Sequence, residues 1–187
     1  MDAFSYLSVL LSIILGLAIT QVLQSVRALM LARSRVRLFA PPVIWAVLTL
    51  LMATQSWWAS FGLADHTAWT FAEFAVVLLQ LVLLYMFAGL VLPDLPPGEP
   101  VDLAEHYWRE ARPLFGLLLA ILVVSLGKDL LIDGHLPAAS NVAFHAVFGT
   151  MAVVGMVSRR RVVHHALALS ALAIMALYIG VLFARLG

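Results

Sequence analysis

The sequence of 187 residues contains no cysteine. Disulfides, thiolate metal sites, iron–sulfur clusters and cysteine nucleophiles are therefore excluded. Charge is also scarce, because only 11% of the residues are Asp, Glu, Lys or Arg, against about 25% in a soluble domain. The net charge of +1 provides no basic field to hold phosphates. These properties exclude a soluble globular enzyme, a disordered chain and a nucleic-acid-binding domain.

Apolar residues are abundant, at 64% of the chain, and the mean hydropathy is +1.04. A membrane-spanning helix needs about 20 mostly apolar residues, so the apolar content suffices for about six spans. We predict an all-α, polytopic transmembrane bundle that forms a single domain over residues 1–187. None of the eight prolines falls inside a predicted span. The predicted spans are residues 4–30, 43–63, 71–92, 114–132, 141–157 and 166–184.

The basic residues predict an orientation. In a six-span topology only Lys128 and Arg185 fall on one side of the membrane, and the other nine basic residues fall on the opposite side. The positive-inside rule then places those nine in the cytoplasm and both termini outside. We expect a multi-pass protein of the bacterial inner membrane, whose first apolar run stays in the mature chain. The nine residues are Arg27, Arg33, Arg35, Arg37, Arg109, Arg112, Arg159, Arg160 and Arg161.

Residues 102–112 differ from the other connections. Asp102 and Glu105 have the spacing of a capping box, and Tyr107 and Trp108 follow with a helical pattern. Trp and Tyr are enriched at headgroup depth. We therefore predict a short amphipathic helix that lies in the cytoplasmic interface, with partner docking as the alternative.

The first predicted span carries small and hydroxylated residues at every fourth position, followed by Gln24. Such a row lets a neighbouring helix approach closely and accept hydrogen bonds. We predict a helix-packing ridge. The alternative is a polar pore lining that forms in an oligomer. The ridge comprises Ser8, Ser12, Gly16 and Thr20.

Five polar side chains in or near the spans are candidates for lining a route for a polar solute or ion. Uncharged amides need partners in hydrocarbon, and intramembrane ions are functional candidates by default. Packing contacts, an anchor at the outer interface or a Glu73–Lys128 ion pair are the structural alternatives. The five residues are Gln24, Glu73, Gln80, Lys128 and Asp129.

The histidines suggest two further roles. His145 lies inside the fifth predicted span and is the candidate for binding haem or a metal, although no second intramembrane histidine matches its depth. His164 and His165 follow three arginines and are predicted to contact lipid headgroups together with Arg159, Arg160 and Arg161. No nucleophile elbow, zinc-protease motif or phosphate loop is present, so we expect no enzymatic activity, no metal and no cofactor other than phospholipid.

Two stretches carry a resemblance. The run from Phe4 to Thr20 and the run His106-Tyr-Trp-Arg-Glu-Ala-Arg-Pro-Leu-Phe-Gly116 resemble a family of small, functionally uncharacterised proteobacterial inner-membrane proteins. The resemblance implies a location in that membrane and no particular activity. From the residues we predict a non-enzymatic accessory or scaffold subunit that packs with lipid and partner helices, as a homo-oligomer or in a larger complex. The alternatives are a small channel or carrier and, second, a haem- or metal-binding redox protein.

Overall fold

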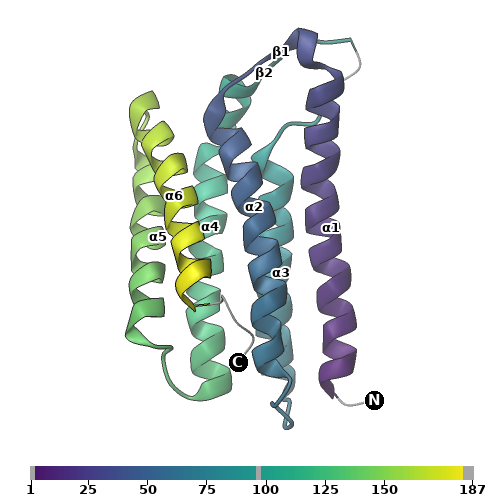
Figure 1. Ribbon diagram of the computed structural model, residues 1–187, viewed down its shortest axis with the longest axis vertical. Coiled ribbons are helices and arrows are strands. Elements are labelled where there is room, and N and C mark those ends of the chain that lie inside the picture. Colours follow the sequence, from purple (N-terminus) through teal and green to yellow (C-terminus); the bar gives the residue numbers. More distant parts are fainter. Residues whose placement is uncertain (1–2, 96–97, 183–187) are drawn as a thin grey trace.

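Long helices dominate the computed structural model of the protein, which describes residues 3–95 and 98–182 (Figure 1). Six helices in this part of the chain are long and apolar enough to cross a membrane. The predicted all-α, six-span fold is therefore confirmed, and the chain is a multi-pass membrane protein. The predicted end of the last span, at residue 184, lies outside the described residues. The helices are α1 (Ala3–Leu31), α2 (Ala40–Ala59), α3 (Phe71–Val91), α4 (Leu103–Asp133), α5 (Ala139–Val157) and α6 (Arg161–Leu182).

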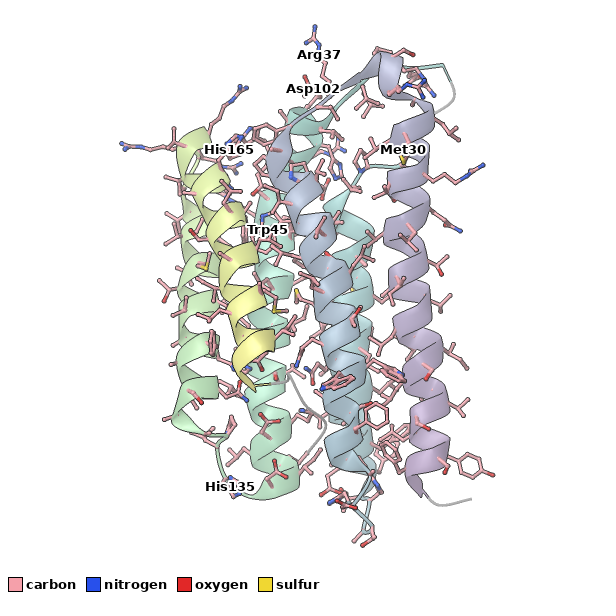
Figure 2. The ribbon with its side chains drawn as sticks, in the orientation of Figure 1. Met30, Arg37, Trp45, Asp102, His135 and His165 are labelled. Atoms are coloured by element: carbon pink, nitrogen blue, oxygen red, sulfur yellow. The ribbon has the colours of Figure 1, made fainter. Side chains whose placement is uncertain are left out.

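The helices alternate in direction, so the α1–α2, α3–α4 and α5–α6 connections lie at one end of the bundle (Figure 1). We call this the basic end, because the nine arginines that the sequence grouped together lie in or next to these connections. The α2–α3 and α4–α5 connections lie at the opposite end, together with the start of α1. Figure 2 shows Arg37 at the basic end and His135 at the opposite end. Which end faces the cytoplasm remains a prediction from the arginine count.

A short parallel pairing joins two connections at the basic end. Strand β1 (Val36–Arg37) pairs with β2 (Val101–Asp102), with Val36 opposite Val101. The Arg35 guanidinium donates a hydrogen bond to the carbonyl oxygen of Glu99 at 2.6 Å. The Arg37–Asp102 ion pair at 3.8 Å contributes little, because the Arg37 side chain is 87% exposed. The backbone pairing and the Arg35 bond therefore hold the α1–α2 connection against the segment that leads into α4.

The predicted interfacial helix over 102–112 is not a separate element, and this prediction was wrong. Helix α4 runs without a break from Leu103 to Asp133 and includes Pro113. Asp102 caps it by accepting hydrogen bonds from the backbone N–H groups of Ala104 and Glu105. Its buried stripe crosses the proline at helical spacing, which packs the part of α4 from Leu103 to Ile121 in the bundle. The stripe comprises Leu103, Tyr107, Ala111, Leu114, Leu118 and Ile121.

The ridge on α1 faces mostly away from the other described helices. Helix α1 turns Leu7, Leu11, Leu15, Ala18 and Val22 into the core. The ridge therefore lies mostly on the outer surface: Ser12, Gly16 and Thr20 are exposed, and Ser8 is half-buried. A Cβ added at Gly16 would meet no atom of the described residues within 4 Å. Three of the four ridge residues are thus free to contact a helix of another chain, and the predicted packing role of the ridge stays a prediction.

Candidate functional site

A cleft of about 360 Å³ lies in the centre of the bundle, and all six helices contribute to its wall. Sites for small ligands typically have volumes of about 300–1,000 Å³, so the cleft has the size of such a site. At its mouth the wall includes Ser60 and Gly62 of the turn after α2 (η2, Ser60–Leu63), together with Asp133 and Pro137 around the α4–α5 connection. These segments place the mouth at the end opposite the arginines.

Polarity changes with depth in the cleft. The inner part is apolar, with Leu11, Leu15, Leu84, Leu118 and Phe148 on its wall. Because a helix rises about 1.5 Å per residue, Leu118 lies about 22 Å along α4 from Asp133 at the mouth. The outer part carries the polar side chains. These are Gln55, Ser56, Ser60, Gln80, Ser125, Lys128, Asp129, Asp133, Asn141, His145 and Tyr178.

Some of these polar groups already have partners. The Lys128 ammonium lies 3.0 Å from the Asp129 carboxylate, so the two charges neutralise each other. The Tyr178 hydroxyl donates a hydrogen bond to Asn141 Oδ1 at 3.2 Å. His145 Nδ1 donates one to the Asn141 backbone carbonyl at 2.9 Å, which leaves Nε2 of this ring as an acceptor.

Other polar groups on the wall lack a partner. Gln55, Gln80 and Ser125 make no hydrogen bond to any described residue. Gln80 lies about 13 Å along α3 from Phe71, well inside the helix. An amide at this depth needs a hydrogen-bond partner, because hydrocarbon offers none. Among the described residues no such partner is present, and water or a bound solute in the cleft can provide it.

A layer of rings, all buried except the half-buried Trp108, closes the inner end of the cleft. On α3 and α4 it begins one helical turn beyond the cleft wall, since Phe87 follows Leu84 and Phe115 precedes Leu118. The Trp45 ring meets those of Phe115 and Phe87 edge-on, with centroids 5.3 and 6.2 Å apart. Figure 2 shows Trp45 between the helices, in the half of the bundle nearer the basic end. We call this layer the aromatic cluster; it comprises Trp45, Phe87, Tyr107, Trp108, Phe115 and His164.

His164 joins the aromatic cluster to the α5–α6 connection. Its side chain is 0% exposed. Nε2 lies 3.0 Å from the Ser158 carbonyl, which only accepts, so this nitrogen carries the hydrogen. Nδ1 of the neutral ring then accepts from the Tyr107 hydroxyl at 2.8 Å. Both ring nitrogens are thus satisfied inside the protein, and the contact ties α6 and Ser158 to α4.

The structure divides the five predicted polar residues. Gln80, Lys128 and Asp129 lie together on the cleft wall. Gln24 is exposed on α1, on the side of the ridge, and is not part of the wall. Glu73 is also absent from it and makes no pair with Lys128; its carboxylate lies 3.6 Å from His66 Nε2. The prediction of a shared lining is therefore wrong for Gln24 and Glu73.

Glu73 instead helps to cap the N-terminus of α3. Its carboxylate accepts hydrogen bonds from the Thr70 backbone N–H at 2.6 Å and the Thr70 hydroxyl at 2.8 Å. The Glu73 N–H donates in turn to the Thr70 hydroxyl oxygen at 3.3 Å. This is a complete capping box. The Thr-x-x-Glu pattern that specifies this cap is visible in the sequence.

Thr70→Ala is expected to destabilise the protein by about 1 kcal/mol, because α3 then loses its N-terminal cap. The matched control is Thr67→Ala, which alters an exposed threonine in the same connection. The thermal unfolding midpoint of the purified protein in detergent measures both effects. Equal midpoints for the two variants would contradict a capping role for Thr70.

The predicted headgroup contacts also need one correction. His164 is wholly buried, so a lipid headgroup cannot reach it, and the prediction was wrong for this residue. His165 is half-buried, and its ring meets Phe39 edge-on at 5.0 Å. Arg159 donates a hydrogen bond to the Trp108 carbonyl at 3.0 Å. Arg160 and Arg161 are exposed, and their contact with lipid stays a prediction.

Eight of the described polar wall residues were not among the predicted lining residues: Gln55, Ser56, Ser60, Ser125, Asp133, Asn141, His145 and Tyr178. Gln55 and Asn141 stand out in the sequence as amides in apolar segments, whereas Ser125 and Tyr178 carry no comparable signal. Their position depends on how each helix is rotated about its axis, and the helical pattern alone does not specify this rotation when most surfaces are apolar.

His145, the candidate for binding haem or a metal, also lies on the wall. Among the described residues, no group of three or more metal-binding side chains converges.

Comparisons of the chain with protein-family models, with curated proteins and with solved structures found no match. The functional argument therefore depends on the geometry of the cleft.

Proposed function

We propose that the protein binds a small hydrogen-bonding solute in the central cleft and acts as a membrane receptor or carrier for it. The observation that carries this proposal is the position of Gln80. Its amide lies deep in the membrane-spanning part of α3, lines the cleft and lacks a partner among the described residues. The absence of a catalytic motif in the sequence favours binding over catalysis.

The closed inner end favours a carrier or receptor over a simple channel. The mouth lies at one end of the bundle, whereas Trp45, Phe87 and Phe115 fill the layer beyond the inner wall with side chains that are almost wholly buried. A continuous pore is therefore not open in this conformation. A carrier would have to rearrange the aromatic cluster to release its solute at the basic end. By the arginine count, the mouth faces the outside of a bacterial inner membrane.

Gln80→Leu is expected to lower the amount of solute that co-purifies with the protein by about tenfold. The reason is that loss of one buried hydrogen bond costs about 1.5 kcal/mol. The protein is purified in lipid nanodiscs, and its bound small molecules are extracted and quantified by mass spectrometry. Gln24→Leu is the matched control, because it changes the same side chain on the outer surface of α1. Identical extracts from wild type and Gln80→Leu would refute the proposal.

A role as an accessory subunit has one observation in its favour. The exposed ridge on α1 places Ser12, Gly16 and Thr20 on the outer surface, where close approach of another helix is possible. This role is compatible with a solute site in the same chain. The native mass of the particle in mild detergent tests it, since a lone monomer would argue against both a homo-oligomer and a fixed partner.

A further inference from the structure

We infer that the solute is a single-chain amphiphile with an uncharged head that donates and accepts hydrogen bonds, such as a hydroxyl or amide group, and an apolar tail. This inference rests on the proposed function and assigns a chemical class to the ligand of the same cleft. The head would lie among Gln80, Ser125 and Gln55, and the tail would point toward Leu84 and Leu118.

The apolar inner part of the cleft determines the tail. Cavities lined only by apolar side chains stay free of water. The apolar wall there includes the half-buried Met52 and Leu122, together with Leu15, Leu84 and Leu118, which are 3%, 2% and 1% exposed. A wholly polar solute would leave this part of the cleft unfilled. An apolar chain fills it and gains contacts with each of these side chains.

The polar outer part of the cleft determines the head. Gln55 and Gln80 each offer amide donors and an acceptor, and Ser125 offers a hydroxyl, without partners among the described residues. A purely apolar molecule would leave these groups unsatisfied, which is unfavourable away from water. A head that both donates and accepts hydrogen bonds satisfies them.

The charges on the wall favour an uncharged head. Lys128 is neutralised by Asp129 at 3.0 Å, so the described part of the wall offers no unpaired cation to an anionic head. Asp133 is the remaining charged residue of the described wall, and it is exposed at the mouth. A charged head beside Gln80 would therefore lack a counter-charge in a region of low dielectric, which is strongly unfavourable.

Photolabelling tests the inference with three probes that share one acyl chain, which carries a diazirine near its end. The heads are glycerol (a monoacylglycerol, uncharged), a carboxylate (a fatty acid) and a trimethylammonium group. Each probe is added to the full-length protein in phosphatidylcholine nanodiscs and irradiated, and the labelled residues are identified by peptide mass spectrometry. Leu84 and Leu118 are 2% and 1% exposed, so label on them reports entry into the cleft rather than contact with bulk lipid.

The monoacylglycerol probe is expected to label Leu84 or Leu118 at least fivefold more than either charged probe. Excess unlabelled monoacylglycerol should abolish this label but not the label on exposed Leu79 and Val123. Gln80→Leu should reduce the label in the cleft about tenfold, and Gln24→Leu should leave it unchanged. Ser125→Ala is a milder variant that should also reduce the label in the cleft. It replaces Gln80→Leu as the test if that variant does not fold.

The outcomes separate this inference from the proposed function. Preferential labelling of the cleft by the fatty acid or the ammonium probe would overturn the uncharged head, while leaving the cleft as a solute site. Label confined to Leu79, Val123 and other exposed side chains would overturn the amphiphile. In that case the mass-spectrometric comparison of wild type with Gln80→Leu still decides whether the cleft binds a polar solute.

Discussion

His164→Ala is expected to lower the thermal unfolding midpoint of the protein by about 10 °C. Removing the ring leaves a cavity in a fully buried site, and large-to-small core substitutions cost about 2–5 kcal/mol. It also leaves the Tyr107 hydroxyl and the Ser158 carbonyl without their partner, which adds to the loss because both groups lie in a poorly hydrated interior. For a chain of this size, each kcal/mol corresponds to about 2–4 °C.

His165→Ala is the matched control for this effect. The neighbouring ring is half-buried, and Nδ1 bonds only to the Arg161 carbonyl in its own helix. Its removal should therefore change the midpoint by less than half as much. Intrinsic fluorescence during heating in detergent measures both variants. Equal decreases for His164→Ala and His165→Ala would contradict a specific role for the Tyr107–His164 bond.

A double substitution tests the bond itself. Tyr107→Phe in the wild-type protein removes the hydroxyl from His164 and should cost about 1–2 kcal/mol. In the His164→Ala background the same hydroxyl has already lost its acceptor, so Tyr107→Phe should then be neutral or slightly stabilising. Additive effects of the two substitutions would show that the two residues do not interact.

Gly155→Ala is expected to destabilise the protein by about 1–3 kcal/mol through overpacking. A Cβ at position 155 would lie 2.6 Å from three carbons of the Phe115 ring. That ring is 0% exposed and packs against Trp45 and His164, so it has little room to move. Either α5 must shift away from α4 or the aromatic cluster must rearrange.

Gly149→Ala is the control on the same helix. A Cβ there would meet Leu119 at 3.9 Å, which is an ordinary contact, and alanine favours the helix by about 1 kcal/mol. This variant should unfold at the same temperature as wild type or slightly higher. In the double variant Gly155→Ala with Phe115→Leu, the smaller side chain should restore part of the loss. The proposed clash would be refuted if Gly155→Ala were as stable as Gly149→Ala.

Both substitutions act on the layer that closes the inner end of the cleft. If the protein is a carrier, this layer has to open during transport, so changes there should alter transport as well as stability. Substitutions on the polar part of the cleft wall, such as Gln80→Leu, should instead alter binding. The two groups of variants therefore separate opening of the cleft from recognition of the solute.

The membrane topology follows directly from the composition and from the spacing of the apolar segments. Each span is a local property, because about 20 consecutive apolar residues suffice for a helix that crosses the bilayer. The alternating directions of the helices and the grouping of arginines at one end follow from the number of spans. The break predicted at Pro113 was wrong because the buried stripe from Leu103 to Ile121 continues through it, and tertiary packing outweighs the local effect of one proline.

The cleft depends on tertiary structure. In a membrane protein both the core and the lipid-facing surface are apolar, so hydrophobic periodicity does not reveal which side of a helix faces inward. Gln24 and Gln80 are both glutamines within predicted spans, yet Gln24 lies on the outer surface and Gln80 lines the cleft. His164 and His165 are adjacent, and only the first is wholly buried. Helix rotation and packing separate these pairs, because both depend on contacts between residues that are distant in the chain.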